Sequence, residues 1–154
     1  MNYPRIALAG LAVWIVSIGL GYLINDIWLM RLYQANAWAF RRAGDVSALV
    51  PIGLAAQFFG SMAFAFAYAK GYEGDGSAIG EGIRFGLLIA VLIDGFAVVW
   101  NYVTLPIAPR LGVLEMVTQI GQFGVLGAIV GLIYQPGRLT LPKDLADQNY
   151  DLRG

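Results

Sequence analysis

The sequence contains no cysteine and no histidine among its 154 residues. Disulfide bonds and thiolate zinc sites are therefore excluded, because both require cysteine. Histidine-ligated haem and catalysis by a Ser–His or Cys–His pair are excluded because histidine is absent. We accordingly predict no catalytic residue, no metal-binding residue and no cofactor.

Charged residues are scarce as well. They make up 13% of the chain, against about 25% in typical soluble domains. Ten basic and ten acidic residues cancel, so no basic excess is present to bind nucleic acid. Hydrophobic residues reach 58%, more than a soluble chain of this size can bury. This composition predicts an integral membrane protein whose main partner is the lipid bilayer.

Four long stretches of the chain are almost free of charge. Each is at least as long as the ~20 residues that a helix needs to cross the hydrocarbon, and none alternates in polarity as a membrane strand would. We therefore predict an all-α membrane protein, a bundle of four transmembrane helices. The predicted helices cover residues 6–30, 47–69, 82–105 and 112–134, in a membrane domain of residues 1–136 followed by a polar C-terminal tail, 137–154. Pro51 is expected in an early turn of the second helix, where proline is tolerated.

An even number of crossings places both termini on the same side of the membrane. Short loops rich in lysine and arginine favour the cytoplasm. Six basic residues fall on the side of the termini and four on the other side: Arg5, Lys70, Arg84, Arg138, Lys143 and Arg153 against Arg31, Arg41, Arg42 and Arg110. The small excess predicts cytoplasmic termini.

Glycine is abundant, with 20 residues, and much of it recurs at helical spacing. Gly82 and Gly86 are four apart on the third predicted helix, and Gly127 and Gly131 are four apart on the fourth. In lipid, small residues permit the close backbone contact that holds helices together. The stripes predict packing within one four-helix bundle. A second interpretation is that one stripe joins a homodimer or a larger membrane complex.

Polar residues inside the predicted helices are the candidate functional groups, because each is costly to place in hydrocarbon. Asp94 lies near the middle of the third helix, where an aspartate costs ~3 kcal/mol. No lysine or arginine lies at its depth. We expect Asp94 to be protonated, or to meet water or amide groups from other helices.

Other polar residues fall at or near the same depth. At about 1.5 Å per residue, Gln57, Gln119 and Gln122 reach the level of Asp94. Four further polar residues are expected closer to the first loop: Asn25, Asp26, Asn101 and Glu115. The pattern predicts a polar vestibule that opens toward the first loop, with Asp94 at its floor; the alternative is that these groups only bond the helices to one another. The candidate ligand-binding or proton-coupling residues are Asp94, Gln57, Gln119, Gln122, Asn101, Glu115 and Asp26.

Short motifs give a further indication. They are GYEG at residues 71–74, EGIRFG at 81–86, NY at 101–102 and PI at 106–107. With these motifs the chain, to about Tyr134, resembles an uncharacterised family of small bacterial four-helix integral membrane proteins. The resemblance implies a bacterial inner-membrane location and a four-helix fold, and it implies no activity.

Three function classes remain open. The first is a small-solute or proton transporter, or a ligand-binding membrane protein, with a polar intramembrane pocket around Asp94. The second is a structural or accessory subunit of a larger membrane complex. The third, a membrane enzyme that acts on lipid, ranks lowest because no nucleophile–base constellation is visible.

Overall fold

The computed structural model describes residues 1–74 and 76–135, so the predicted tail of residues 137–154 lies outside the described residues. Every regular element in the described ranges is a helix. Four helical stretches are long and apolar enough to cross a membrane: Tyr3–Trp28, Ala43–Gly71, Ala78–Thr104 and Pro109–Ile133. The four predicted helices are thereby confirmed. The largest boundary differences are four residues, at Ala43 where 47 was predicted and at Ala78 where 82 was predicted.

Two of these stretches contain a π-helical segment. The first consists of α1 (Tyr3–Gly21) and the π-helix η1 (Tyr22–Trp28). The third consists of α4 (Ala78–Ile93), the π-helix η3 (Asp94–Val98) and α5 (Val99–Thr104). The sequence pattern predicted continuous α-helices and gave no sign of either segment. Such segments are rare and concentrate at functional sites, and here each contains an aspartate, Asp26 in η1 and Asp94 in η3.

The second stretch is a single helix, α3 (Ala43–Gly71), and the expected position of its proline was wrong. Because α3 begins at Ala43, Pro51 lies in the helix interior rather than in an early turn. Proline has no N–H to donate to the carbonyl four residues earlier. Membrane helices tolerate this loss where neighbouring groups compensate for the freed carbonyl. The fourth stretch, α6 (Pro109–Ile133), does carry its proline in the first turn.

The connection after η1 contains the short helix α2 (Met30–Ala35) and the 3₁₀ turn η2 (Ala37–Ala39). Buried Asn36 fixes this connection to the bundle. Its Nδ2 donates to the Leu32 carbonyl at 2.8 Å, and its Oδ1 accepts from the Ala108 N–H at 2.9 Å. The first loop is thus bonded to the turn between α5 and α6.

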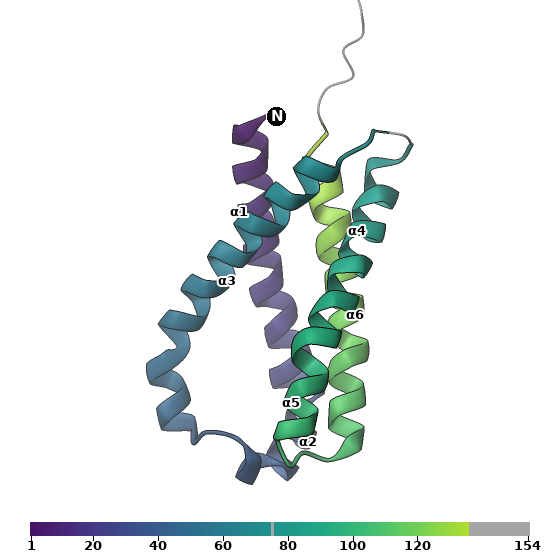
Figure 1. Cartoon of the computed structure of the whole chain (residues 1–154). Helices are drawn as coiled ribbons and strands as arrows, with labels where there is room; N and C mark the ends of the chain where they lie inside the picture. The colour runs from purple at the N-terminus through teal and green to yellow at the C-terminus, as the bar shows by residue number, and fades with distance from the viewer. Residues whose placement is uncertain (75, 136–154) are drawn as a thin grey trace, which may run out of the picture.

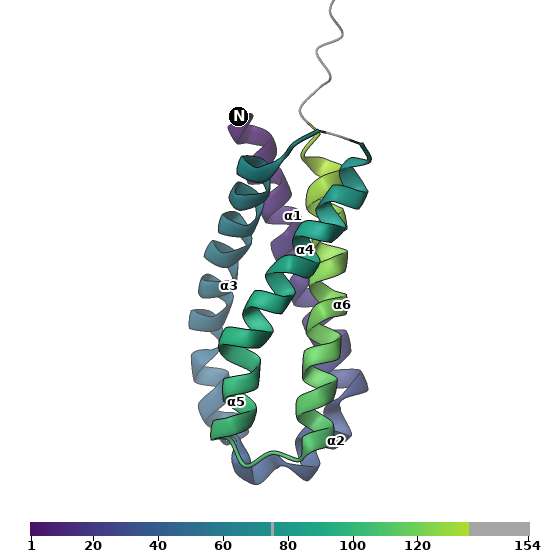
Figure 2. The ribbon, with the colours of Figure 1, turned by 45° about the vertical axis from the view of Figure 1, so that its right-hand side comes forward.

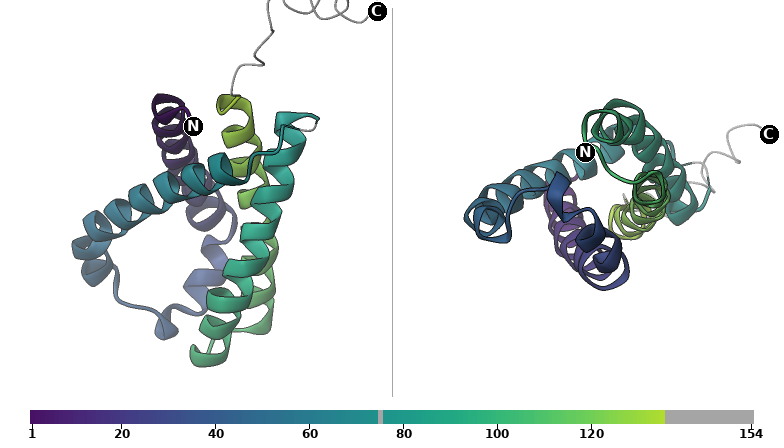
Figure 3. Two further views of the ribbon diagram at one scale, coloured as in Figure 1. Left: turned by 45° about the horizontal axis from the view of Figure 1, so that its top comes forward. Right: turned by 90° about the horizontal axis from the view of Figure 1, so that it is seen from below.

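The long helices follow one another around the bundle in the order α3, α1, α6 and α4. Figure 1 shows the N-terminus and the end of α6 at one end of the bundle, which we call the termini end, and α2 at the other, the loop end. Helices α4 and α6 lie close at the termini end and separate toward α5 (Figure 2). Helix α3 leans away from the other helices toward the loop end (Figure 3).

An aromatic cluster connects α3, α4 and α6 near the termini end. Phe64 and Tyr68 of α3 pack on Phe85 of α4, with ring centroids 4.9 and 5.5 Å apart. Tyr68 also packs on Tyr134 and donates its hydroxyl to the Ala78 carbonyl at 3.1 Å. This cluster holds α3 against its neighbours, whereas residues 43–56 at the other end of the helix are all exposed.

Glycines bring α4 and α6 into backbone contact. A Cβ added at Gly82 or Gly127 would overlap the carbonyl oxygen of the other. One added at Gly86 would overlap the carbonyl oxygen of Phe123, and would be 3.1 Å from the Gly127 Cα. The glycine stripes of the two helices therefore face each other within one chain, as the first interpretation of their spacing predicted.

Candidate functional site

A cavity of about 590 Å³ lies between α1, α3, α4 and α6. Its walls are mostly apolar, with Phe64, Ile89, Ile93 and Phe123 among the residues that line them. The polar groups at the cavity are amides and hydroxyls from three helices: Ser17, Gln57, Ser61, Gln119 and Gln122. No residue with a charged side chain lines it in the part of the chain that the structure describes.

Hydrogen bonds between α1 and α3 fix one wall of this cavity. Gln57 donates from Nε2 to the Ser17 Oγ at 2.9 Å, and Ser17 donates in turn to the Trp14 carbonyl at 2.8 Å. The Trp14 indole N–H donates to the Leu54 carbonyl of α3 at 3.2 Å. With its amide nitrogen held by Ser17, Gln57 retains its carbonyl oxygen as an acceptor at the cavity.

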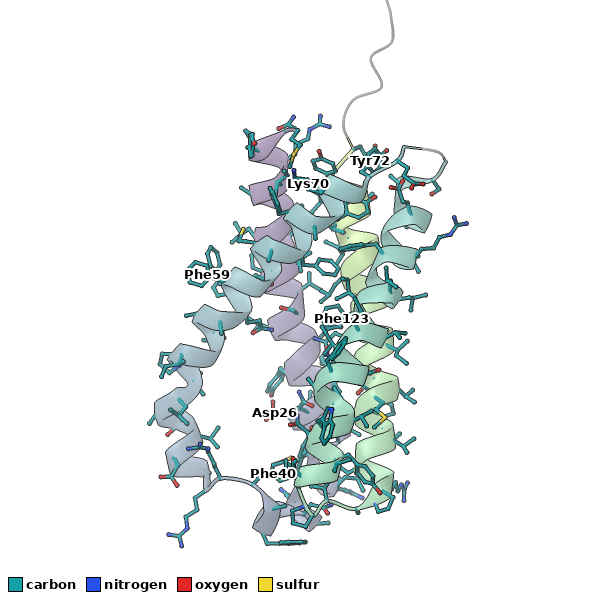
Figure 4. All side chains as sticks on the ribbon, viewed as in Figure 1. Asp26, Phe40, Phe59, Lys70, Tyr72 and Phe123 are labelled. Atoms are coloured by element: carbon teal, nitrogen blue, oxygen red, sulfur yellow. The ribbon has the colours of Figure 1, made fainter. Side chains whose placement is uncertain are left out.

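Helical spacing explains the polar positions. Gln57 and Ser61 are four residues apart on α3, and Gln119 and Gln122 are three apart on α6, so each pair shares one helix face. Phe123 and Leu126 extend the α6 wall toward the termini end. Figure 4 shows Phe123 in the interior of the bundle and Phe59 on the outer side of α3, pointing away from it.

Asp94 lies beside this cavity and is not among the residues that line it, although the preceding Ile93 is. Gly82, Gly86 and Ala90 of α4 are buried and spaced four residues apart, and this row faces α6. Asp94 follows Ala90 by the same spacing and continues the row. Its Oδ1 atom is buried and has no hydrogen-bond partner among the described residues. A buried carboxyl oxygen without a partner is costly, and the cost is far larger for an ionised group than for a neutral acid.

A second polar cluster lies at the loop end. Tyr33 of α2 donates its hydroxyl to the Glu115 Oε1 at 2.8 Å and lies 3.3 Å from the Asn25 Oδ1. Burial raises the pKa of the Tyr33 hydroxyl above its ordinary value, and the hydrogen bond to Glu115 and the negative charges of Glu115 and Asp26 raise it further. This cluster joins α2, η1 and α6.

The predicted vestibule is therefore divided. Gln57, Gln119 and Gln122 come together at the cavity, as their depth along the helices predicted. Glu115 instead bonds Tyr33 at the loop end, where exposed Asp26 also lies (Figure 4). Asn101 is exposed on α5 and joins neither group.

Sequence reasoning missed Ser17, Ser61 and Tyr33. A signal existed for the serines: Ser17 is the one serine in the charge-free stretch of residues 6–24, and Ser61 lies one helical turn after Gln57. Tyr33 gave no such signal, because it comes from the connection after the first membrane helix, whose path the sequence does not define.

The arrangement is suited to binding a molecule that has both polar and apolar parts. Amide and hydroxyl groups provide donors and acceptors, and the aromatic and aliphatic walls provide apolar contact. Among the described residues that line the cavity, no histidine, lysine or carboxylate accompanies the two serines to act as a base.

Comparison with protein-family models, with curated proteins and with solved structures finds no match to this chain.

Proposed function

We propose that this chain is a multi-pass protein of the bacterial inner membrane that binds a small molecule in the cavity between its helices and takes part in moving it. Four apolar helices support the membrane location. The excess of basic residues on the side of the termini supports cytoplasmic termini, and the resemblance to small bacterial four-helix proteins supports the inner membrane.

The cavity is the observation that carries the proposal. Its volume of about 590 Å³ lies within the range of about 300–1,000 Å³ that small-molecule sites occupy. Mostly apolar walls with a few convergent polar groups are the usual composition of such sites. Five amide and hydroxyl side chains from three helices converge on the cavity, and one pair of them, Gln57 and Ser17, also bonds α3 to α1.

Asp94 is the proton-coupling group in this proposal. It is the first residue of η3 and directly follows Ile93 of the cavity wall, and its Oδ1 has no partner among the described residues. Carboxyl groups inside membrane proteins are common proton carriers. A change in its protonation at the start of the π-helical segment η3 would alter the α4 wall next to the bound molecule.

Native mass spectrometry of the full chain, released from mild detergent, tests the proposal. We expect a non-covalently bound small molecule on the wild-type protein and its loss from the double variant Gln57→Leu, Gln122→Leu. The matched control is Gln34→Leu, a glutamine of the exposed part of α2. Wild-type protein that carries no bound species, or that keeps it in the double variant, would overturn the proposal.

The exposed half of α3 favours a second candidate, an accessory subunit of a larger membrane complex. Residues 43–56 of α3 are all exposed. Because the α4 and α6 glycines already pack together, a partner or a second copy would dock on α3 instead. This candidate predicts a stoichiometric membrane protein that co-purifies with the wild type and is lost from Ile52→Arg, with the cavity empty.

A further inference from the structure

We propose that the ligand of the cavity is an uncharged, chain-like lipid that enters sideways from the bilayer between α3 and α4. This inference rests on the proposed function and specifies its ligand class. It follows from the position of the cavity mouth, from the charge of the walls and from the covering of the termini end.

The mouth is identified by lining residues that are themselves exposed. Gly60, Ala63 and Ala67 of α3 all line the cavity, and all three are exposed. A Cβ added at Gly60 would meet no atom within 4 Å. Small side chains on this face of α3 therefore leave the cavity open through the side of the bundle, where the backbones of α3 and α4 stay apart and aromatic side chains such as Phe64 and Phe85 connect the two helices.

This mouth lies at the depth of the hydrocarbon. Gly60 precedes the end of α3 at Gly71 by eleven residues, which at about 1.5 Å per residue is roughly 16 Å. The hydrocarbon is about 30 Å thick, so Gly60 lies near its middle when α3 spans it. A molecule that reaches the cavity through this mouth must first dissolve in the bilayer.

Charge complementarity restricts the ligand further. None of the described residues that line the cavity is charged, and the sequence has no charge from Val46 to Ala69 along α3. An ionised ligand would have no counter-charge there, at a cost that hydrocarbon makes large. An uncharged head bearing a hydroxyl, carbonyl or amide suits the three glutamines at the cavity, and a hydrocarbon chain suits Ile89, Ile93 and Phe64.

Direct entry from water at the termini end is obstructed. Tyr68 and Tyr134 are 1% and 3% exposed and lie in the aromatic cluster between the cavity and that end. By contrast, the half of α3 beyond the cavity is exposed and almost wholly apolar, so hydrocarbon can occupy the space beside it at little cost. The lateral route, past the small exposed residues Gly60 and Ala63, is open.

Photolabelling of the full chain in vesicles of phosphatidylethanolamine and phosphatidylglycerol tests the inference. The probe is a sixteen-carbon alcohol that carries a diazirine, and a short diazirine-bearing polyol serves as the water-soluble comparison. We expect the long-chain alcohol to label the cavity segments 57–64 and 119–126, in competition with unlabelled long-chain alcohol. Ala63→Trp should lower this labelling roughly tenfold, which corresponds to about 1.4 kcal/mol of binding free energy.

Two further variants keep the test decisive. Gly60→Leu fills the same mouth with a smaller change and should also lower the labelling. Phe59→Trp enlarges a side chain that is 69% exposed and points away from the cavity, and should leave the labelling unchanged. Equal labelling in all variants would overturn the inference. Cavity labelling by the polyol alone would overturn it while leaving the proposed function standing.

Discussion

Substitution of Gly127 by alanine should destabilise the bundle by about 2 kcal/mol. The added Cβ would overlap the Gly82 carbonyl oxygen, and would lie 2.9 Å from the Gly82 carbonyl carbon and 3.0 Å from the Gly86 Cα. Carbon atoms in contact prefer about 3.5–4.0 Å. These neighbours are backbone atoms of α4, so no side-chain rotation relieves the overlap and the helices must separate.

The magnitude follows from two opposed contributions. Overpacking costs about 1–3 kcal/mol, and contact with rigid backbone places this site at the upper end. Alanine gains up to ~1 kcal/mol over glycine in helix propensity. The net loss is therefore about 2 kcal/mol.

The assay is equilibrium unfolding in mixed micelles of a mild detergent and sodium dodecyl sulfate, followed by circular dichroism. Gly121→Ala is the matched control on the same helix, because its Cβ would meet no atom within 4 Å. We expect this control to be as stable as the wild type or slightly more stable. Equal free energies of unfolding for Gly127→Ala and Gly121→Ala would refute the close contact of α4 with α6.

Three other predictions concern the polar groups and the orientation. Tyr33→Phe should lower the free energy of unfolding by about 1–3 kcal/mol, because Glu115 loses its hydrogen-bond donor. Since folding raises the pKa of Tyr33, the greater stability of the wild type should be complete below about pH 10 and should decline as the pH rises further. Unfolding measured at a series of pH values checks both statements. Asp94→Asn should keep the fold while abolishing ligand-dependent proton movement, measured with a pH-sensitive dye in vesicles. The control Asp45→Asn should leave this proton movement unchanged. In whole cells an impermeant maleimide should label Trp38→Cys and leave Glu73→Cys unlabelled until lysis; the reverse pattern would invert the proposed orientation.

The helices were predictable because length and hydrophobicity determine them almost alone. A charge-free run of about twenty residues has few alternatives to a membrane helix, and its ends shift by only a few residues with the flanking polar groups. The glycine contact of α4 with α6 was also predictable. A spacing of four residues places Gly82 and Gly86 on one face of α4, and Gly127 and Gly131 on one face of α6.

The division of the polar residues was not predictable. Depth along each helix predicted that the three glutamines lie at one level, and they line one cavity. The rotation of each helix about its axis, however, depends on packing that the sequence does not define. The π-helical segments add a residue to a turn and rotate the remainder of the helix. Asn101 follows η3 in the chain and is exposed on α5, away from the residues that line the cavity. Tyr33 belongs to the connection between the first two membrane helices, where no helical periodicity in the sequence indicates which way a side chain points.

A crystal structure of the protein grown from a lipidic mesophase tests the central claim most directly. We predict elongated density in the cavity, with its polar end within hydrogen-bond distance of Gln57, Gln119 or Gln122 and its tail directed past Ala63 into the bilayer. A structure in which α3 packs against α4 and α5 along its whole length, with the three glutamines bonded to one another and no space between them, would contradict it.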